Sequence, residues 1–429
     1  MAPATTIVNA KVFDGTNARD WTSVRFADGL ITGCSVDSAV QEGDEVVDAA
    51  GGTVFPGLID AHVHLVPGAL AQSLTFGVTT VLDMFSKPDQ VAEAKEQAGS
   101  RRDVADVRSS GVGATAPDGH PSLMYAPFPT VTTAGEAERF VAERVAEGSD
   151  HLKIISGVGG LWPALDSDTI TALVTAAHAR GLVVVAHVSS TAGVEQVVSA
   201  GVDVLAHVPA DTELDPALVD RIAEAGIAVG PTLATIENTL GGRGGAAVVA
   251  DPRLAEALGA AWTRRLTEDV PVVGGRAMPP YSRAEDNVRR LADAGVAVLA
   301  GTDAPNPGTV FGASLHRELE LLVRCGISPA RALTAATAEP ARVFGLADRG
   351  RVAVGQRADL VLVSGDPLAD ITETRGIERI WREGTACDRR AFVASTAEAE
   401  QLDAFDAQVA KVVAAVRERR STFGPPRVR

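Results

Sequence analysis

The sequence predicts an α/β fold in which a (β/α)8 TIM-like barrel carries a small β-sandwich domain built from both chain ends. Three observations predict this architecture. Apolar strand-like runs alternate with helical segments through the middle of the chain, several helical segments end at a glycine, and both chain ends are rich in short strands and turns. A doubly wound sheet is the competing architecture, but it usually has fewer strands.

The middle of the chain supplies the strands of the predicted barrel. The apolar runs are residues 55–65, 78–84, 104–112, 151–156, 182–187, 202–207, 227–231 and 296–303. Helical segments such as 134–147 and 168–180 separate them, and Gly148 and Gly181 follow where a glycine suits the residue after a helix. Eight strands alternating with helices is the count of a (β/α)8 barrel.

Domain boundaries follow from these patterns. We expect residues 1–55 plus 350–390 to form the β-sandwich domain, residues 56–349 the barrel, and residues 391–429 a helical tail. The long interval at about 232–294 separates the seventh and eighth runs. Because long insertions after barrel strands usually cover the active face, this interval predicts a lid.

Composition limits the partners of the protein. The chain has 429 residues, 46% of them hydrophobic, and a net charge of −16 from 39 Lys and Arg against 55 Asp and Glu. This acidity argues against nucleic acid or an anionic membrane as a partner. Cys34, Cys325 and Cys387 are far apart and form no metal-binding spacing, which predicts reduced thiols and a cytoplasmic protein. We also expect no membrane span and no secretory signal.

Two histidines close the first run. His62 and His64 are separated by one residue, so on a strand both side chains point to the same face. Imidazoles placed side by side are typical of two ligands for one divalent cation. The alternative is a strand end with two partly exposed histidines.

Further polar residues occupy equivalent places in later runs. They are Lys153 in the fourth run, His187 at the end of the fifth, His207 at the end of the sixth and Asp303 at the end of the eighth. In a barrel, the C-terminal ends of the strands meet on one face, which is where the chemistry takes place. Taken singly, each histidine could be a hydrogen-bonded structural residue, Asp303 could cap a turn, and Lys153 could pair with a carboxylate. We expect His178 and His316, which fall in helical segments, to be solvated.

An ordered set of motifs makes the assignment more specific. The motifs are PGLIDAHVH at 56–64, GVTTV at 77–81, KIISG at 153–157, AHVSS at 186–190, GVDV at 201–204, GTDA at 301–304, GRV at 350–352 and GQRADL at 355–360. Over about residues 5–370 the chain resembles the amidohydrolase superfamily. The resemblance is closest to the imidazolonepropionase-like branch, which includes metal-dependent prolidases.

The resemblance implies a binuclear metal site. His62, His64 and Asp303 would bind one metal ion, and His187 and His207 would bind the second. Lys153 would bridge the two ions as a carbamate derived from CO2, because an ammonium has only donors whereas a carbamate supplies two anionic oxygens. Zn2+ is the expected metal, and Mn2+, Co2+ or Fe2+ would also fit.

The resemblance also implies an activity. A metal-dependent hydrolase of this kind would cleave the C–N amide bond of a small molecule, using a hydroxide shared by two metals and Asp303 as general base. An Xaa-Pro dipeptide, an N-acyl amino acid and an aryl amide or urea all remain open as substrates. His120, Tyr125 and Tyr281 are the candidate substrate contacts. A homo-oligomer would be ordinary for such an enzyme.

Other functions on the same fold stay open. A hydrolytic deaminase or a cyclic-amide hydrolase is the main alternative, and a non-catalytic scaffold relative is the remote one. Many deaminases carry a glutamate three residues after the fifth-strand histidine, where this chain has Ser190. Related prolidases often carry Glu-His at the sixth strand, where this chain has Ala206 before His207. Strand alternation predicts that Ala206 faces outward.

Overall fold

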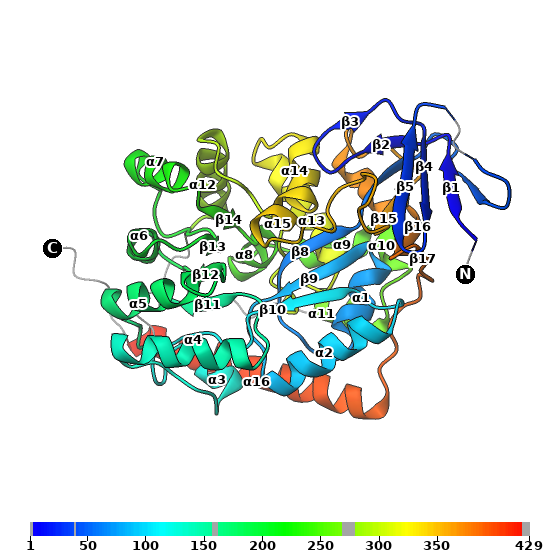
Figure 1. The fold of residues 1–429 in the computed structure, drawn as a ribbon. Coiled ribbons are helices and arrows are strands. Elements are labelled where there is room, and N and C mark those ends of the chain that lie inside the picture. Colours follow the sequence, from blue (N-terminus) through cyan, green and yellow to red (C-terminus); the bar gives the residue numbers. More distant parts are fainter. Residues whose placement is uncertain (1–2, 38–39, 157–161, 268–278, 423–429) are drawn as a thin grey trace.

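Two parallel sheets form the centre of the molecule (Figure 1). The computed structural model describes residues 3–37, 40–156, 162–267 and 279–422. The sheet orders are β10-β9-β8 and β11-β12-β13-β14. The strands are β8 (Leu58–Val63), β9 (Val78–Asp83), β10 (Asp106–Ser109), β11 (Leu152–Ile155), β12 (Val184–His187), β13 (Val204–Ala206) and β14 (Ala228–Gly230). The predicted α/β fold with parallel strands is therefore confirmed.

Single bridges connect neighbouring runs beyond these sheets. Isolated parallel bridges pair Ala114 with Ile154, Val229 with Val298, and Val63 with Ala304. The eighth predicted run, residues 296–303, forms no continuous strand and contributes only a single bridge residue, Val298. Its backbone nevertheless lies beside β8, because the amide of Ala61 donates to the carbonyl of Ala300 at 2.9 Å. The first and eighth runs are thus neighbours.

Helices follow most of the strands. Those before the insertion are α1 (Ala69–Thr75), α2 (Pro88–Ser100), α3 (Ser122–Tyr125), the 3-10 turn η1 (Ala134–Glu136), α4 (Ala137–Ala146), α5 (Ser167–His178), α6 (Thr191–Ala200) and α7 (Pro216–Glu224). Of these, α5, α6 and α7 begin at a capping side chain. Asp166 caps α5 by accepting from the amide of Thr169 at 2.7 Å. Figure 1 shows α4 to α7 in series on the outer side of β11 to β14.

The interval predicted as a lid is mostly helical. It contains α8 (Leu233–Thr239), α9 (Gly244–Ala250), α10 (Pro252–Ala255), α11 (Ala260–Thr267) and α12 (Tyr281–Asp293). Residues 268–278 of this interval, and Gly157 of the KIISG motif, lie outside the described residues. The chain then continues through α13 (Ala313–Arg324), α14 (Pro329–Ala335) and α15 (Ala338–Val343).

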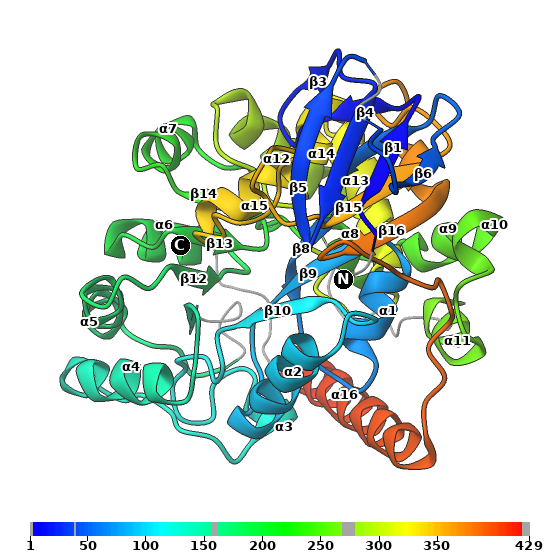
Figure 2. The same cartoon turned by 45° about the vertical axis from the view of Figure 1, so that its right-hand side comes forward.

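Both chain ends contribute to two further sheets, which Figure 2 shows together at one side of the molecule. One sheet has the order β5-β4-β1-β6 and consists of β1 (Thr5–Val8), β4 (Ser23–Ala27), β5 (Leu30–Ser35) and β6 (Glu45–Asp48). The other has the order β17-β16-β15-β7-β2-β3 and consists of β2 (Lys11–Phe13), β3 (Ala18–Arg19), β7 (Thr53–Pro56), β15 (Leu360–Val363), β16 (Ile377–Arg382) and β17 (Thr385–Ala386). A 3-10 turn, η2 (Ile371–Arg375), precedes β16.

The two ends of the chain are joined by strand pairing. Strand β15 runs antiparallel to β7, with Leu360 opposite Pro56. Side chains of both sheets, among them Phe26 and Trp381, belong to one buried apolar cluster. The rings of Phe26 and Trp381 meet edge to face, with centroids 5.6 Å apart. Residues more than three hundred positions apart therefore share one core.

A long helix, α16 (Thr396–Thr422), ends the described chain. It packs against α3. Asp406 of α16 pairs with Arg265 of α11 at 2.5 Å, and Gln408 donates to the carbonyl of Leu123. Neither this helix nor any other in the described ranges is both long and apolar enough to cross a bilayer.

Candidate metal centre

His62 and His64 converge on Asp303 at the C-terminal end of β8. Oδ1 of Asp303 lies 3.0 Å from Nε2 of His64 and 3.3 Å from Nε2 of His62. Gly301 lets the eighth run pass this close, because a Cβ on Gly301 would lie 2.9 Å from the Cβ of His62. One carboxylate oxygen is thus within reach of two imidazoles.

His207 and His187 extend the group on the other side of His62. The ring centroids of His62 and His207 are 4.9 Å apart, and those of His187 and His207 are 4.7 Å apart. Nδ1 of His207 lies 4.0 Å from Oδ2 of Asp303. Ligand atoms of His62, His207 and Asp303 all fall within 4.8 Å of one another, a spacing that suits a metal centre.

Lys153 lies in the interior, on β11. Its neighbours Leu152 and Ile154 belong to the apolar core, while Lys153 itself is 2% exposed. Its Nζ is buried and has no hydrogen-bond partner among the described residues. Gly113 leaves room for the stem, because a Cβ there would lie 3.3 Å from the Cγ of Lys153. A buried amine without a partner is costly, which points to a bound group that the protein side chains do not supply.

The electrostatics of the group suit a cation. Burial lowers the pKa of His62 and His187 well below the ordinary value of 6.5, and it lowers the pKa of His207 to about 4. These imidazoles are therefore neutral and have lone pairs to donate. Burial acts to raise the pKa of Asp303, but the hydrogen bond with His64 and the nearby charges hold it below its ordinary value.

The residues therefore fit divalent ions. Neutral imidazoles and an ionised carboxylate are the donors that Zn2+ and related ions prefer. Nδ1 of His64 and Nε2 of His187 are buried without partners in the described chain, as is Nζ of Lys153. Burial lowers the pKa of Lys153 to about 7, so a large share of this amine is neutral and able to form a carbamate near neutral pH.

The position of Ala206 differs from the prediction. Ala206 lies in a buried cluster with Val185 and residues of other parallel strands, whereas Leu205 belongs to the larger core that includes the helices. Ala206 is therefore the inward residue, and the prediction that it faces outward was wrong. His207 escapes the two-residue alternation because its backbone is left-handed, with φ 73°.

Asp60 is a site residue that the sequence analysis missed. It is fully buried and accepts from the amide of His62 at 3.1 Å, from the amide of Thr302 at 3.0 Å and from the hydroxyl of Thr302 at 2.7 Å. Asp60 thereby ties His62 to the residue before Asp303. Its signal in the sequence was a charged residue inside an otherwise apolar run.

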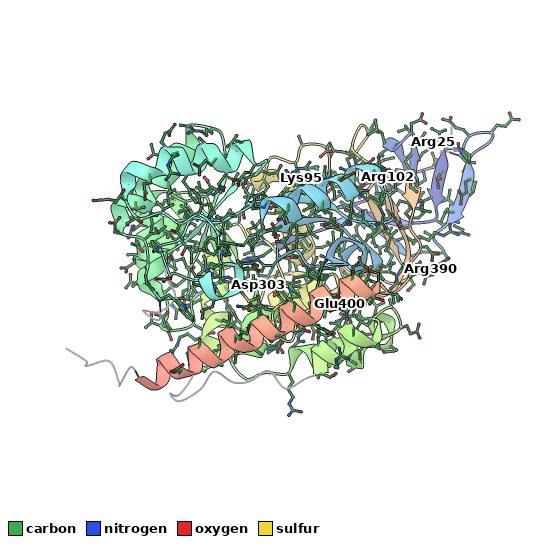
Figure 3. All side chains as sticks on the ribbon, turned by 90° about the horizontal axis from the view of Figure 1, so that it is seen from below. Arg25, Lys95, Arg102, Asp303, Arg390 and Glu400 are labelled. Carbon is green, nitrogen blue, oxygen red and sulfur yellow. The ribbon has the colours of Figure 1, made fainter. Side chains whose placement is uncertain are left out.

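Two of the three predicted substrate contacts lie beside the histidines. The ring of His120 is 5.3 Å from that of His187, and the ring of Tyr125 is 6.5 Å from that of His64. Tyr125 also stacks on Phe85, with centroids 4.7 Å apart. Figure 3 shows the face on which α16 lies, with Asp303 labelled in the same view.

Tyr281 has different surroundings. It begins α12, where burial and the charges of Glu318 and Glu237 raise the pKa of its hydroxyl. That hydroxyl is buried and has no hydrogen-bond partner within the described ranges. A role of Tyr281 in substrate binding stays a prediction.

The two helical histidines have different environments. His178 is exposed, as predicted, and lies 3.0 Å from Asp203. The prediction that His316 is solvated was wrong. His316 is 1% exposed and bonds to the hydroxyl of Thr374 at 2.9 Å and to the carbonyl of Phe76 at 3.0 Å. It is buried because η2 packs against α13, the helix that carries it.

A sequence profile of the Amidohydrolase family matches residues 53–387. The chain belongs to the amidohydrolase family. An amidohydrolase is a metal-dependent enzyme that acts on C–N bonds, so the predicted family and the predicted enzyme class are confirmed.

Individual relatives are similar over different lengths. An imidazolonepropionase of Deinococcus deserti is 45% identical over 101 residues, which are 23% of this chain and 25% of that protein. An imidazolonepropionase of Salinispora arenicola is 28% identical over 411 residues, covering 87% of this chain and 94% of that protein. The crystal structure of a candidate prolidase from Bifidobacterium longum superposes with a TM-score of 0.73 at 26% identity, covering 94% of this chain and 99% of that chain.

Proposed function

We propose that this amidohydrolase cleaves the C–N amide bond of a small molecule, using two divalent metal ions. The observation that carries the proposal is the position of the Asp303 carboxylate, whose oxygens lie 3.0 Å from His64, 3.3 Å from His62 and 4.0 Å from His207. His62, His64 and Asp303 would hold one ion, and His187 and His207 the other. Zn2+ is our first choice, with Mn2+, Co2+ and Fe2+ as alternatives.

Lys153 would join the two ions as a carbamate. The proposal is supported by its buried, unpartnered Nζ and by the lowered pKa of that amine. In the reaction of the neutral amine with CO2, nitrogen would form a bond to carbon and lose one proton to solvent, which gives an anion with two acceptor oxygens that suits a site between two cations. A protonated lysine would instead repel both ions.

The proposal also covers the architecture. We assign residues 56–349 to a closed (β/α)8 barrel with a lid at about 232–294, residues 1–55 plus 350–390 to a β-sandwich domain, and residues 391–429 to a helical tail. The isolated bridges between neighbouring runs support closure of the barrel. The buried cluster shared by the two terminal sheets supports the sandwich.

Different residues of the chain would transfer the proton and orient the substrate. When bound, the two ions supply Lewis acidity and an activated water. Asp303, held ionised beside His64, would accept the proton of that water and deliver it to the leaving nitrogen, first as general base and then as general acid. His120 and Tyr125 would orient the substrate next to the histidines. Burial lowers the pKa of His120 to about 4, so it would act as a neutral hydrogen-bonding group.

The substrate class remains open among three kinds of amide. These are Xaa-Pro dipeptides, N-acyl amino acids, and aryl amides or ureas. A hydrolytic deaminase or a cyclic-amide hydrolase on the same fold is the second candidate. Ser190 weighs against deamination, because its hydroxyl caps α6 by accepting from the amide of Gly193 at 3.2 Å and therefore has a structural task.

Cell location and assembly belong to the same proposal. Cys34, Cys325 and Cys387 are all free, which supports a reducing cytoplasm. The acidic chain would act on a small molecule and not on nucleic acid or membranes. A homo-oligomer is the expected assembly.

A substrate screen tests the function. Metal-reconstituted protein would be incubated with one panel each of Xaa-Pro dipeptides, N-acyl amino acids, aryl amides, aryl ureas, cyclic amides and aminopurines or aminopyrimidines. Release of a free amine from an amide or urea is the expected result. Turnover of the ring amines with release of ammonia, and of no amide, would contradict the proposal.

A further inference from the structure

The first helix of the predicted lid, α8, is buried next to the metal centre. Thr232 is the residue before it, has no exposed surface, and adopts a left-handed backbone with φ 52°. Such a backbone is unfavourable for a β-branched residue and persists only where neighbouring contacts enforce it. The contacts of this segment therefore indicate its structural role.

Two hydrogen bonds connect this segment to proposed metal ligands. The hydroxyl of Thr232 lies 2.7 Å from Nδ1 of His207 and so fixes the orientation of that ring. One turn later, the hydroxyl of Thr235 donates to the carbonyl of Thr302 at 2.8 Å, and Thr302 directly precedes Asp303. The start of α8 thus contacts His207 directly and contacts Asp303 through the preceding residue, Thr302.

A buried carboxylate holds this helix from the other side. Glu318 lies on α13 and has no exposed surface. Its two oxygens accept from the amides of Leu233, at 3.0 Å, and Ala234, at 2.7 Å, which are the first two residues of α8. A carboxylate is the side chain that best satisfies free amides at the start of a helix.

Glu318 is buried without a cationic partner in the described chain. Its two oxygens bond to the amides at the start of α8, and no arginine or lysine forms an ion pair with it within the described ranges. Its neighbour Glu320, by contrast, pairs with Arg317 at 2.8 Å. Burying an acid without a cation reduces stability unless the group does something else.

We propose that Glu318 is a positioning residue for the metal centre, acting through α8 on His207 and Asp303. This inference rests on the proposed function, because it assumes that these two residues bind metal. Glu318 fixes the first turn of α8, Thr232 and Thr235 transmit that position, and both ligand side chains are held ready before an ion arrives. The first helix of the predicted lid, α8, would then hold the metal ligands in position instead of opening and closing over them.

Metal affinity is the readout that separates positioning from simple stability. We would measure Zn2+ and Mn2+ binding by equilibrium dialysis for the parent, Glu318→Gln, Thr232→Val and the double variant. Glutamine keeps the shape of Glu318 but leaves one acceptor for two amides. We expect each single variant to bind the more weakly held ion about 10- to 100-fold less tightly, with kcat reduced and KM nearly unchanged.

The double variant and the conservative variant Thr232→Ser test whether Glu318 acts on the ligands through Thr232. If Glu318 acts through Thr232, the double variant should bind metal no more weakly than the worse single variant. Thr232→Ser, which keeps the hydroxyl, should recover most of the affinity. Glu96→Gln, at an exposed position on α2 far from α8, is the control, and its metal affinity should equal that of the parent. Thr235→Val, a partly exposed position, gives a second route should Glu318→Gln fail to fold.

The outcomes are distinguishable. A parent protein that binds fewer than two ions contradicts the proposed function and this inference with it. A parent that binds two ions, with Glu318→Gln or Thr235→Val binding them equally well, overturns only the inference. Additive losses in the double variant would likewise show that Glu318 and Thr232 act independently.

Discussion

His207 and Asp303 share an unusual backbone conformation and face each other across the candidate metal centre. Both are left-handed, with φ 73° and 57°, and Nδ1 of His207 lies 4.0 Å from Oδ2 of Asp303. Residues other than glycine adopt this conformation rarely, and such strain is concentrated at functional sites. In both cases it turns a side chain at the end of a run toward the other ligands.

Metal content is the first prediction. Protein produced with excess metal should hold close to two divalent ions per chain, because the donor set divides into two groups of ligands. Elemental analysis measures the content, and prolonged dialysis against a chelator should abolish activity until Zn2+ or Mn2+ is returned. Active protein with one ion or none would contradict the binuclear site.

Removal of Lys153, the proposed bridge, is the second prediction. Lys153→Ala should lose at least one ion and nearly all activity, because no anion then lies between the two cations. Acetate or propionate in solution should restore part of the activity by filling the place of the carbamate. Lys411→Ala, an exposed position on α16, is the matched control. Full metal content and full activity in Lys153→Ala would assign Lys153 a structural role.

The third prediction concerns the proton acceptor. Asp303→Asn keeps one ligand oxygen but cannot accept the proton of water, so kcat should fall by about 10²–10⁴-fold while much of the metal remains. Steady-state rates and metal content would be measured together. Asp203→Asn is the control, because Asp203 lies at the opposite end of β13 and bonds to His178. Parent-like turnover in Asp303→Asn would place the general base elsewhere.

Burial of His316 predicts a dependence of stability on pH. Burial lowers the pKa of His316 to about 3, below its ordinary value of 6.5. The folded state therefore favours the neutral ring, and the resulting stability is complete above about pH 6.5 and is lost as the pH falls toward 3. The loss is at most about 1.4 kcal/mol for each pH unit.

A glutamine at the same position isolates this effect. His316→Gln can still bond to Thr374 and Phe76 but does not titrate. Urea unfolding at pH 7, 6, 5 and 4 should show a shallower decline for His316→Gln than for the parent. His178→Gln, at an exposed position, should decline as the parent does. Parallel curves for the parent and His316→Gln would refute the assignment.

The fifth prediction concerns the attachment of α16. Arg265 pairs with Asp406 of α16 at 2.5 Å, lies over the ring of Phe405 at 5.6 Å, and donates to the carbonyl of Pro305 at 3.3 Å. Arg265→Gln should therefore speed hydrogen exchange in α16 and in α3. Arg264→Gln, an exposed neighbour, is the control. Unchanged exchange in α16 would mean that other contacts hold the helix.

Features that depend on local pattern were predictable from the sequence. The parallel strands follow from short apolar runs, and the first of these runs holds β8 with His62 near its end. Lys153 could be assigned to the interior for the same reason, since Leu152 and Ile154 lie in the core. These predictions needed no knowledge of distant residues.

Other features depend on partners far away in the chain. Glu318 caps a helix that lies 85 residues earlier, and no periodicity links Glu318 to Leu233. His316 looked solvated because its burial depends on η2, which lies far downstream. The facing of Ala206 was predicted wrongly because the left-handed backbone of His207 interrupts strand alternation. Such a backbone is usually signalled by a glycine, and none is present here.

The contact between His64 and Asp303 spans 239 positions of the chain. During synthesis, the first two ligands emerge long before the last, so the complete site exists only after the eighth run has returned to β8. At the proposed site, metal ions would therefore bind tightly only to chains that have finished folding, and their binding energy would favour that state over every partly folded one. Metal uptake would then be a measure of completed folding.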